Sequence, residues 1–277
     1  MQTVLVDYHV HPNYSIDAQD VAMEVYCQRA LELGLKEICF TPHFECNPRR
    51  RHLDWFIRLE GQLIPMEQLE AWVPLYLDEV KRLQDEYGDR LWVGAGIEVG
   101  YEEGLEGAIE KLLSSYSFDF VIGSIHCLED VAISSTRESA AYFPCRDVEE
   151  ILELYSRRME RLIASGFFHT VGHFDIYRRH GEKYFGSRLR EREEEYLVPL
   201  LKEVAKRGLA LEINTSGTKT GTDFFPSTRF LELAREAGVE VCSVGSDAHR
   251  PEELGREVEK ALGLIKRYGF RLLTRAG

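Results

Sequence analysis

The chain repeats one pattern seven times: a short apolar run followed by an amphipathic helical stretch. This pattern predicts strands over residues 4–11, 36–43, 91–98, 118–126, 168–173, 209–214 and 239–247. Helices are expected over residues 18–33, 65–87, 105–115, 146–165, 188–207, 226–237 and 252–268, with a short last strand over 270–273. Strands that alternate with helices, with no run of strands alone, indicate an α/β fold with a parallel sheet.

Polar side chains that can bind metals or substrates stand at the carboxyl end of every predicted strand. In chain order these residues are His9, His11, His43, Glu98, His126, His173, Asn214, Asp247 and His249. The carboxyl ends of the strands in a β/α barrel ring one face, where active sites are built. An open doubly wound sheet would spread the same residues along a line. We therefore favour a closed barrel, formed by residues 1–277 as a single domain.

Composition restricts the partners of this protein. Its 277 residues are 44% hydrophobic and carry a net charge of −13, which argues against nucleic-acid and anionic-membrane partners. No apolar run approaches the roughly 20 residues of a membrane span, and residues 1–7 do not resemble a signal peptide, so we expect a cytoplasmic protein. The cysteines show no C-x-x-C spacing, and we expect all six to be reduced: Cys27, Cys39, Cys46, Cys127, Cys145 and Cys242.

The strand-end residues form a candidate metal site. His9 and His11 are two residues apart on a strand and leave the same face, as do Asp247 and His249. Taken singly, His126 or His173 could be a histidine of the core. Imidazole and carboxylate ligands without thiolates favour Zn²⁺, Mn²⁺ or Fe²⁺. The set is too large for one tetrahedral ion, so we expect two or three ions that share carboxylates.

The motifs around these residues resemble the PHP (polymerase and histidinol phosphatase) family over essentially the whole chain. They are His9-x-His11 with Asp17, Thr41-Pro42-His43, Gly96-Ile97-Glu98, Gly123-Ser124-Ile125-His126, Gly172-His173-Phe174-Asp175 and Gly245-Ser246-Asp247-Ala248-His249. Three further motifs are similar to those of the histidinol-phosphate phosphatase branch: Glu212-Ile213-Asn214-Thr215-Ser216-Gly217, Phe225-Pro226-Ser227 and the last motif extended to Arg250-Pro251.

The resemblance implies a distorted (β/α)7 barrel, TIM-like in design, with three divalent ions. One ion would take His9, His11, Glu98 and Asp247; a second would take Glu98, His126 and His173; the third would take Asp17, His43 and His249. The chain departs from the family at two positions. Some relatives carry His where this chain has Asp17, and relatives often carry Asp where it has Pro42.

The activity implied by the resemblance is hydrolysis of L-histidinol phosphate to L-histidinol and phosphate, a step of histidine biosynthesis. A metal-bound hydroxide would be the nucleophile, and Glu98, Asp247 and His249 would be the catalytic residues. The ions would leave the site with net positive charge, which suits a phosphate monoester dianion. Two alternatives use the same barrel: a phosphatase that acts on another small phosphate ester or on phosphotyrosine, and a metal-binding module without catalytic activity. An amidohydrolase is disfavoured because no lysine ends a strand.

Candidate substrate contacts are less strongly indicated than the metal ligands. Guanidinium and ammonium groups bind phosphate, and amide and hydroxyl groups can donate hydrogen bonds to a substrate. The candidates are Arg178, Arg179, Lys219, Arg250, Asn214 and Ser216, although each cation could equally be a surface charge. Two long segments, residues 44–64 and 128–144, interrupt the strand–helix pattern after strands. Each could be a solvated loop, a lid or a wall of the substrate site.

Overall fold

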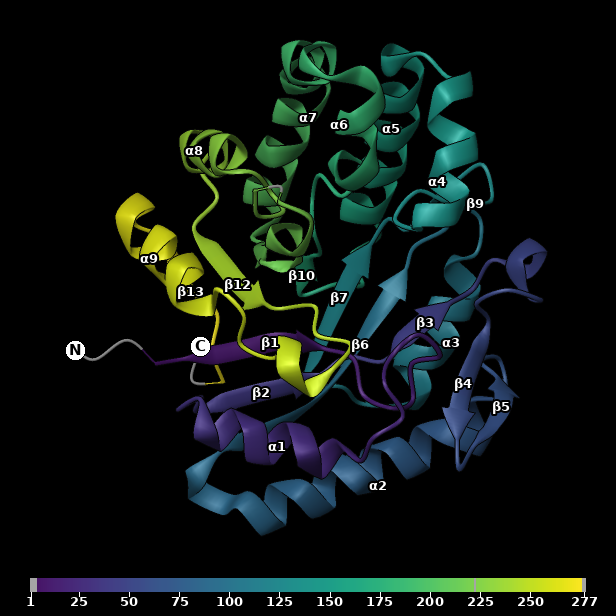
Figure 1. Cartoon of the computed structure of the whole chain (residues 1–277), viewed down its shortest axis with the longest axis vertical. Coiled ribbons are helices and arrows are strands. Elements are labelled where there is room, and N and C mark those ends of the chain that lie inside the picture. Colours follow the sequence, from purple (N-terminus) through teal and green to yellow (C-terminus); the bar gives the residue numbers. More distant parts are fainter. Residues whose placement is uncertain (1–3, 222, 276–277) are drawn as a thin grey trace.

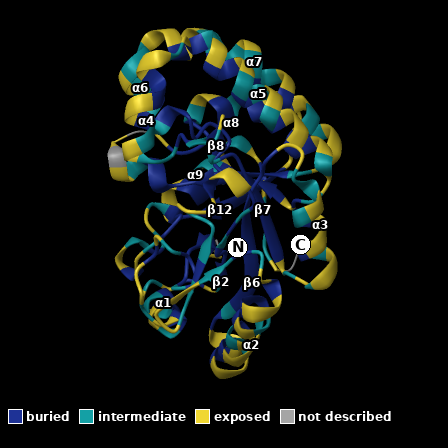
Figure 2. Ribbon diagram, turned by 90° about the vertical axis from the view of Figure 1, so that its right-hand side faces the viewer, coloured by how far each residue is buried: buried dark blue, intermediate teal, exposed yellow. Residues whose placement is uncertain are grey.

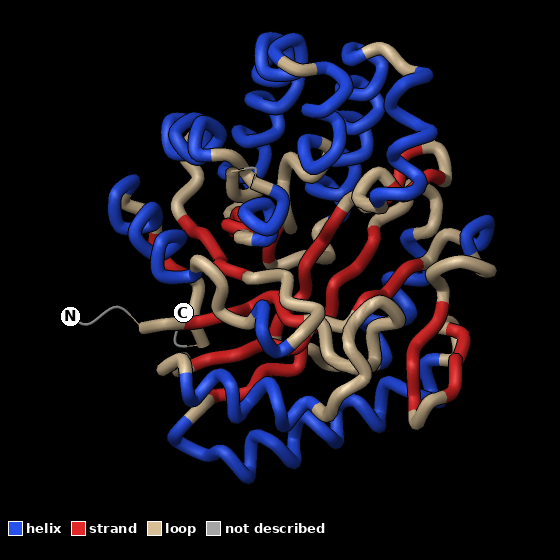
Figure 3. The backbone as a smooth tube through the Cα atoms, in the orientation of Figure 1, coloured by secondary structure: helices blue, strands red, loops and turns tan. Residues whose placement is uncertain are grey.

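A curled parallel sheet forms the centre of the computed structural model, which describes residues 4–221 and 223–275 (Figure 3). Its strands follow the order β1 (Val6–Val10), β2 (Glu37–Phe40), β6 (Trp92–Gly100), β7 (Phe120–Ser124), β10 (Thr170–Val171), β11 (Ala210–Asn214), β12 (Val241–Gly245) and β13 (Arg271–Leu272). All of these neighbours pair in parallel. The seven predicted strands are therefore confirmed, in the predicted order.

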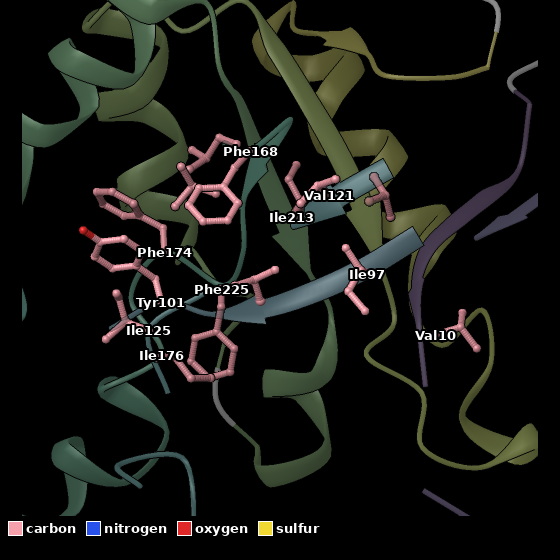
Figure 4. Packing of buried hydrophobic residues seen from close by; sticks show 14 of the residues in the cluster. Val10, Ile97, Tyr101, Val121, Ile125, Phe168, Phe174, Ile176, Ile213 and Phe225 are labelled. Atoms are coloured by element: carbon pink, nitrogen blue, oxygen red, sulfur yellow. The ribbon is translucent and has the colours of Figure 1, made fainter. Parts of the chain in front are cut away.

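The strands are buried on both faces because helices cover the outside of the sheet (Figure 2). These helices are α1 (Met23–Glu32), α2 (Leu69–Tyr87), α3 (Glu106–Ser115), α5 (Val148–Ser165), α7 (Ser187–Arg207), α8 (Thr228–Glu236) and α9 (Val258–Tyr268), seen around the sheet in Figure 1. Short 3₁₀ helices lie at Pro48–Arg50, Gly88–Arg90, Phe143–Cys145, Ser216–Thr220 and Pro251–Glu253. Aromatic side chains such as Phe168, Phe174 and Phe225 pack beside the strands (Figure 4).

The sheet closes on itself at one end only. Just after β12, the Asp247 amide donates a hydrogen bond to the carbonyl of His9 (2.9 Å), and the His11 amide donates to the carbonyl of Ala248 (2.8 Å). At its amino end β12 pairs instead with β13, through Val241 and Arg271. The strands thus form a distorted (β/α)7 barrel whose carboxyl ends meet in a ring, and the predicted fold is confirmed.

Several element boundaries differ from the prediction. The strand expected over 36–43 is split at Thr41 and Pro42 into β2 and β3 (His43–Glu45), because proline has no amide hydrogen for the ladder. The helix expected from residue 65 begins at Leu69, since Pro65 ends strand β5. The helix expected from residue 18 begins at Met23, and helix α6 (Arg178–Phe185) was not predicted.

The two long segments, residues 44–64 and 128–144, have secondary structure of their own. We call them the first and the second insertion. The first contains β3 and the hairpin of β4 (Phe56–Leu59) and β5 (Gln62–Pro65), and the second contains β9 (Val131–Ala132) and α4 (Thr136–Tyr142). Strand β8 (Cys127–Leu128) leads into the second insertion and pairs with β9. Both insertions lie on the same side of the barrel (Figure 1).

Two expectations from composition can be compared with the fold. All six cysteines are free, and Cys145 is the exposed one. Among the helices that residues 4–221 and 223–275 form, none is both long and apolar enough to cross a membrane.

Candidate metal centre

Glu98 is the centre of the site. It lies on β6, is 1% exposed, and points both carboxylate oxygens at histidines. Its Oε1 lies 3.1 Å from His126 Nε2 and 3.0 Å from His173 Nε2, and accepts a hydrogen bond from the Ser124 hydroxyl (2.6 Å). These residues come from β6, β7 and the segments after β7 and β10, so neighbouring strands deliver them to one point.

The other oxygen of Glu98 faces a second group of ligands. Glu98 Oε2 lies 3.3 Å from His9 Nε2 and 3.5 Å from His11 Nε2. Asp247 completes this group, with its Oδ1 3.2 Å from His11 Nε2 and 3.8 Å from His9 Nε2. One carboxylate therefore stands between two sets of histidines, as the bridging role predicted for Glu98 requires.

A third group lies nearer to solvent. Asp17 Oδ2 is 3.5 Å from His43 Nε2 and 3.3 Å from His249 Nε2. The other ring nitrogen of His43, Nδ1, is 3.0 Å from Glu98 Oε2. The Asp17 side chain is 54% exposed, against 15% for His43. The third group is thus the most accessible part of the site.

All nine predicted ligands meet in this cluster, and the cluster suits divalent ions. Three groups of ligand atoms within 4.8 Å of one another occur among the described residues: His9 with His11 and Asp247, His43 with Glu98 and His126, and His11 with His43 and His249. Glu98 Oε2 is buried and has no hydrogen-bond partner among the described residues. Burial opposes ionisation of Glu98, yet His9 and His126 hold the pKa of its carboxyl well below the usual value. An ionised carboxylate that has one unpartnered oxygen and lies among imidazoles fits a bound cation.

Two carboxylates that we did not predict hold the histidines in place. Glu212 accepts a hydrogen bond from His9 Nδ1 through Oε1 (2.6 Å) and from the His173 amide through Oε2 (2.7 Å). Glu45 Oε1 lies 2.5 Å from His126 Nδ1. A carboxylate behind a metal-binding imidazole fixes the tautomer in which the facing nitrogen is free for a metal. Glu212 precedes Asn214 by two residues on β11, so strand alternation was the signal that could have revealed it.

Ser15 supports two of the histidines. Its hydroxyl oxygen accepts a hydrogen bond from the His43 amide (3.2 Å) and lies 3.2 Å from His11 Nδ1. One buried hydroxyl thus steadies a ligand of the second group and a ligand of the third.

The backbone at two ligands is strained. His173 and Asp247 have φ angles of +22° and +55°, a region that residues other than glycine rarely adopt. At Asp247 the strained residue makes the hydrogen bond to His9 that closes the ring. Strain of this kind persists where the surrounding structure enforces it, which is typical of functional sites.

Close packing around the site requires glycine at position 245. A Cβ atom built on Gly245 would lie 2.2 Å from the Cβ of His9 and 2.7 Å from Glu212 Oε1. Because Gly245 has no side chain, β12 can approach β1 closely while His9 and Glu212 remain in contact.

Of the adjacent candidate arginines Arg178 and Arg179, only Arg179 lines the cavity above the ligands. Arg179 Nη2 donates to the Ser216 hydroxyl (2.6 Å), lies 3.4 Å from Asp247 Oδ2, and lines the cavity above the ligands. Arg178 faces away from the cavity and pairs with Asp175 and Glu182. Sequence spacing alone did not separate these neighbours.

The remaining candidate substrate residues occupy different environments. Asn214 is fully buried, donates to Glu212 (3.2 Å) and accepts from Ser216, so it supports the site from behind. Lys219 Nζ contacts the Asp247 carbonyl (3.1 Å) and Glu253 (2.8 Å), close to the ligands but outside the cavity lining. Arg250 is exposed and does not line the cavity.

A cavity of about 480 Å³ opens over the ligand cluster. Part of its lining comes from the ligand cluster and Arg179: Asp17, His43, Glu98, His126, His173, Arg179, Asp247 and His249. Another part comes from both insertions, which contribute Glu45, Arg50, Leu53, Asp54, Ala132, Ser134, Ser135, Arg137 and Glu138. The insertions are therefore walls of the cavity, as one of the sequence-based alternatives proposed.

A comparison with protein-family models identifies the family to which the chain belongs. The model of the PHP domain matches residues 7–216, which contain most of the ligand cluster. The chain belongs to the PHP family. Among curated PHP proteins, the probable histidinol-phosphatase of Deinococcus radiodurans is 32% identical over 273 residues, covering 98% of this chain and 96% of that protein. The histidinol-phosphatase of Lactococcus lactis is 27% identical over 281 residues, covering 97% and 93%.

Solved structures agree with this PHP fold. The histidinol phosphate phosphatase of Lactococcus lactis, crystallised with zinc, L-histidinol and phosphate, superimposes with a TM-score of 0.74 at 24% identity, covering 98% of this chain and 96% of that one. A second solved structure, of a protein from Listeria monocytogenes, gives a TM-score of 0.78 at 20% identity, covering 92% of this chain and 99% of that one. The chain is thus a PHP-family protein similar to histidinol-phosphatases over nearly its whole length.

Proposed function

We propose that this protein is a metal-dependent phosphomonoesterase that hydrolyses L-histidinol phosphate to L-histidinol and phosphate. The observation that carries the proposal is the convergence of nine imidazole and carboxylate side chains, with Glu98 at their centre, beneath a cavity that Arg179 also lines. The choice of L-histidinol phosphate rests on the curated relatives of this chain, one of which is described as a probable histidinol-phosphatase and another as a histidinol-phosphatase.

The ligands would divide among three ions in the way the family resemblance implies. His9, His11, Glu98 and Asp247 would hold the first; Glu98, His126 and His173 the second; Asp17, His43 and His249 the third. Zn²⁺, Mn²⁺ or Fe²⁺ suits this donor set. When bound, such ions lower the pKa of a coordinated water and neutralise charge on phosphoryl oxygens.

The side chains of this chain would orient the substrate and keep the ligands fixed. Arg179 presents a guanidinium group to the cavity beside Asp247, where it would bind a phosphoryl oxygen of the ester. The Ser216 hydroxyl and the ring of Phe225, 5.4 Å from the guanidinium carbon, hold Arg179 in this position. Glu212 and Glu45 would keep Nε2 of His9 and of His126 free of a proton and directed at the ions.

Phosphate release from a panel of small phosphomonoesters tests the proposal. Protein loaded with Zn²⁺ or Mn²⁺ is expected to hydrolyse L-histidinol phosphate with a kcat/KM of about 10⁴ M⁻¹s⁻¹ or higher, well above that for other esters. Slow and even hydrolysis across the panel would retain a phosphoesterase and reject this substrate. The absence of phosphate release from every ester, by protein shown to contain its metals, would reject the proposal altogether.

A further inference from the structure

Arg50 of the first insertion is a buried arginine that joins the two insertions. It is 4% exposed, although it lies in a short 3₁₀ helix within a run of three arginines. Its Nε and Nη2 donate to Asp54 Oδ2 (2.8 and 2.5 Å) in its own insertion. Its Nη1 and Nη2 donate to Glu138 Oε2 (2.7 Å) and Oε1 (3.0 Å) in the second insertion.

Further contacts surround this junction. Arg50 Nη1 also donates to the carbonyl of Asp130 (2.8 Å), and Asn47 donates to the Asp130 carboxylate (2.8 Å). Glu138, the partner of Arg50, also accepts a hydrogen bond from the Ala132 amide (3.0 Å), which joins α4 to β9. Every nitrogen of the Arg50 guanidinium is therefore used, and its contacts with Glu138 and with the Asp130 carbonyl join the first insertion to the second.

The neighbouring arginines make weaker contacts of a different kind. Arg49 pairs with Asp130 but is 77% exposed, and Arg51 pairs with Glu67 and lies over Trp55 at 60% exposure. Exposed ion pairs contribute little to stability, whereas removing one partner of a buried pair is costly. Of the three arginines, Arg50 is thus the one whose loss would separate the insertions.

The junction lies in the wall of the cavity. Arg50, Asp54 and Glu138 all line it, beside the exposed Leu53 and Arg137. Metal ligands and Arg179 line the same cavity, so the leaving group of an ester whose phosphoryl group binds there would share the cavity with this wall.

We propose that Arg50 binds the two insertions into a single wall and thereby determines which leaving groups the cavity admits. This inference rests on the proposed phosphomonoesterase function and concerns the specificity of the same site. Arg50 acts through Asp54 and Glu138 and is a positioning residue. Lysine cannot replace it, because an ammonium group lacks the planar set of N–H donors that allows a guanidinium group to bind two carboxylates at once.

Arg50→Lys and Arg50→Met test this inference, with Arg49→Met as the matched control. For each protein, kcat and KM are measured with L-histidinol phosphate and with phosphotyrosine, whose leaving group is bulkier. We expect both Arg50 variants to raise KM for L-histidinol phosphate and to shift the ratio of kcat/KM values toward phosphotyrosine by about tenfold or more. Arg49→Met should leave the ratio within about twofold of wild type, because its ion pair is exposed.

Metal content and circular dichroism show whether the barrel is intact in each variant. If the Arg50 variants do not fold, Glu138→Gln and Asp54→Asn each weaken the junction while Arg50 stays in place, and the same shift in the ratio is expected. Active variants with an unchanged ratio would overturn the inference and leave Arg50 a purely structural residue. Failure of the proposed function is a separate result, because it would be seen in the metal-loaded wild-type protein.

Discussion

Replacing Glu212 with glutamine should weaken metal binding without unfolding the barrel. Each oxygen of Glu212 accepts a hydrogen bond that fixes a ligand, from His9 Nδ1 at 2.6 Å and from the His173 amide at 2.7 Å. A glutamine has one acceptor oxygen and one amide group that only donates, so one of these two donors must face another donor. The carboxylate charge that favours the metal-binding tautomer of His9 is lost as well.

The expected magnitude follows from these two contacts. A hydrogen bond to a charged group contributes about 1.5–3 kcal/mol, which corresponds to a factor of about 10–150 in a binding constant. Loss of a carboxylate behind a metal-binding histidine typically lowers metal affinity or activity by about 10–100-fold. We therefore expect Glu212→Gln to raise the dissociation constant of at least one ion by about 10–100-fold.

Competition with a chromophoric chelator measures this dissociation constant directly, and circular dichroism monitors the fold. Glu193→Gln is the matched control, because Glu193 is also a buried carboxylate (5% exposed) but contacts Tyr177 and Arg178 instead of a ligand. Wild-type metal affinity in Glu212→Gln would refute the reasoning. An equal loss of metal affinity in both variants would show that the loss of any buried carboxylate weakens metal binding, whether or not it contacts a ligand.

Three further outcomes are expected. Glu98→Gln should lose at least one ion and nearly all phosphatase activity, measured by metal analysis and phosphate release, because both of its oxygens face ligands. Arg179→Lys should raise KM for phosphate esters with little change in metal content. Lysine keeps the positive charge near Asp247 but cannot form the paired hydrogen bonds of a guanidinium group to a phosphate. Burial raises the pKa of Glu193 to about 7, against the opposing charge of Arg178, so the native state keeps this proton to higher pH than the unfolded chain does. The free energy of unfolding should therefore fall by up to about 3 kcal/mol between pH 4.5 and 8, and Glu193→Gln should flatten this dependence in urea titrations.

The ligand cluster was predictable because parallel strands place their carboxyl ends together. Once seven strand–helix units were recognised, His9, Glu98 and Asp247 had to face one ring even though they are far apart in sequence. The closure between His9 and Asp247 was predicted in outline, but its hydrogen bonds and the positive φ of Asp247 depend on the exact curl of the sheet.

The supporting and substrate-facing residues could not be resolved in the same way. Arg178 and Arg179 are adjacent at the start of a helix that the sequence pattern did not predict, and adjacent helical residues point about 100° apart. Glu45 ends β3, which lies beyond the strand predicted over residues 36–43. The sequence therefore did not show that Glu45 and His43 point to the same face of one strand. Arg50 resembled any exposed arginine until the second insertion was placed against it.

The ring of strands is joined across its two ends at the place where ions would bind. His9 and His11 stand near the beginning of the chain and Asp247 near its end, and all three belong to one group of ligand atoms. An ion held by this group would act as a reversible cross-link that closes a loop of more than two hundred residues, comparable in effect to a long-range disulfide. The chain-entropy model for a loop of this length gives about 5.5 kcal/mol. Chelation would then remove this cross-link and lower the free energy of unfolding, while the backbone hydrogen bonds that close the ring at His9 and His11 would remain.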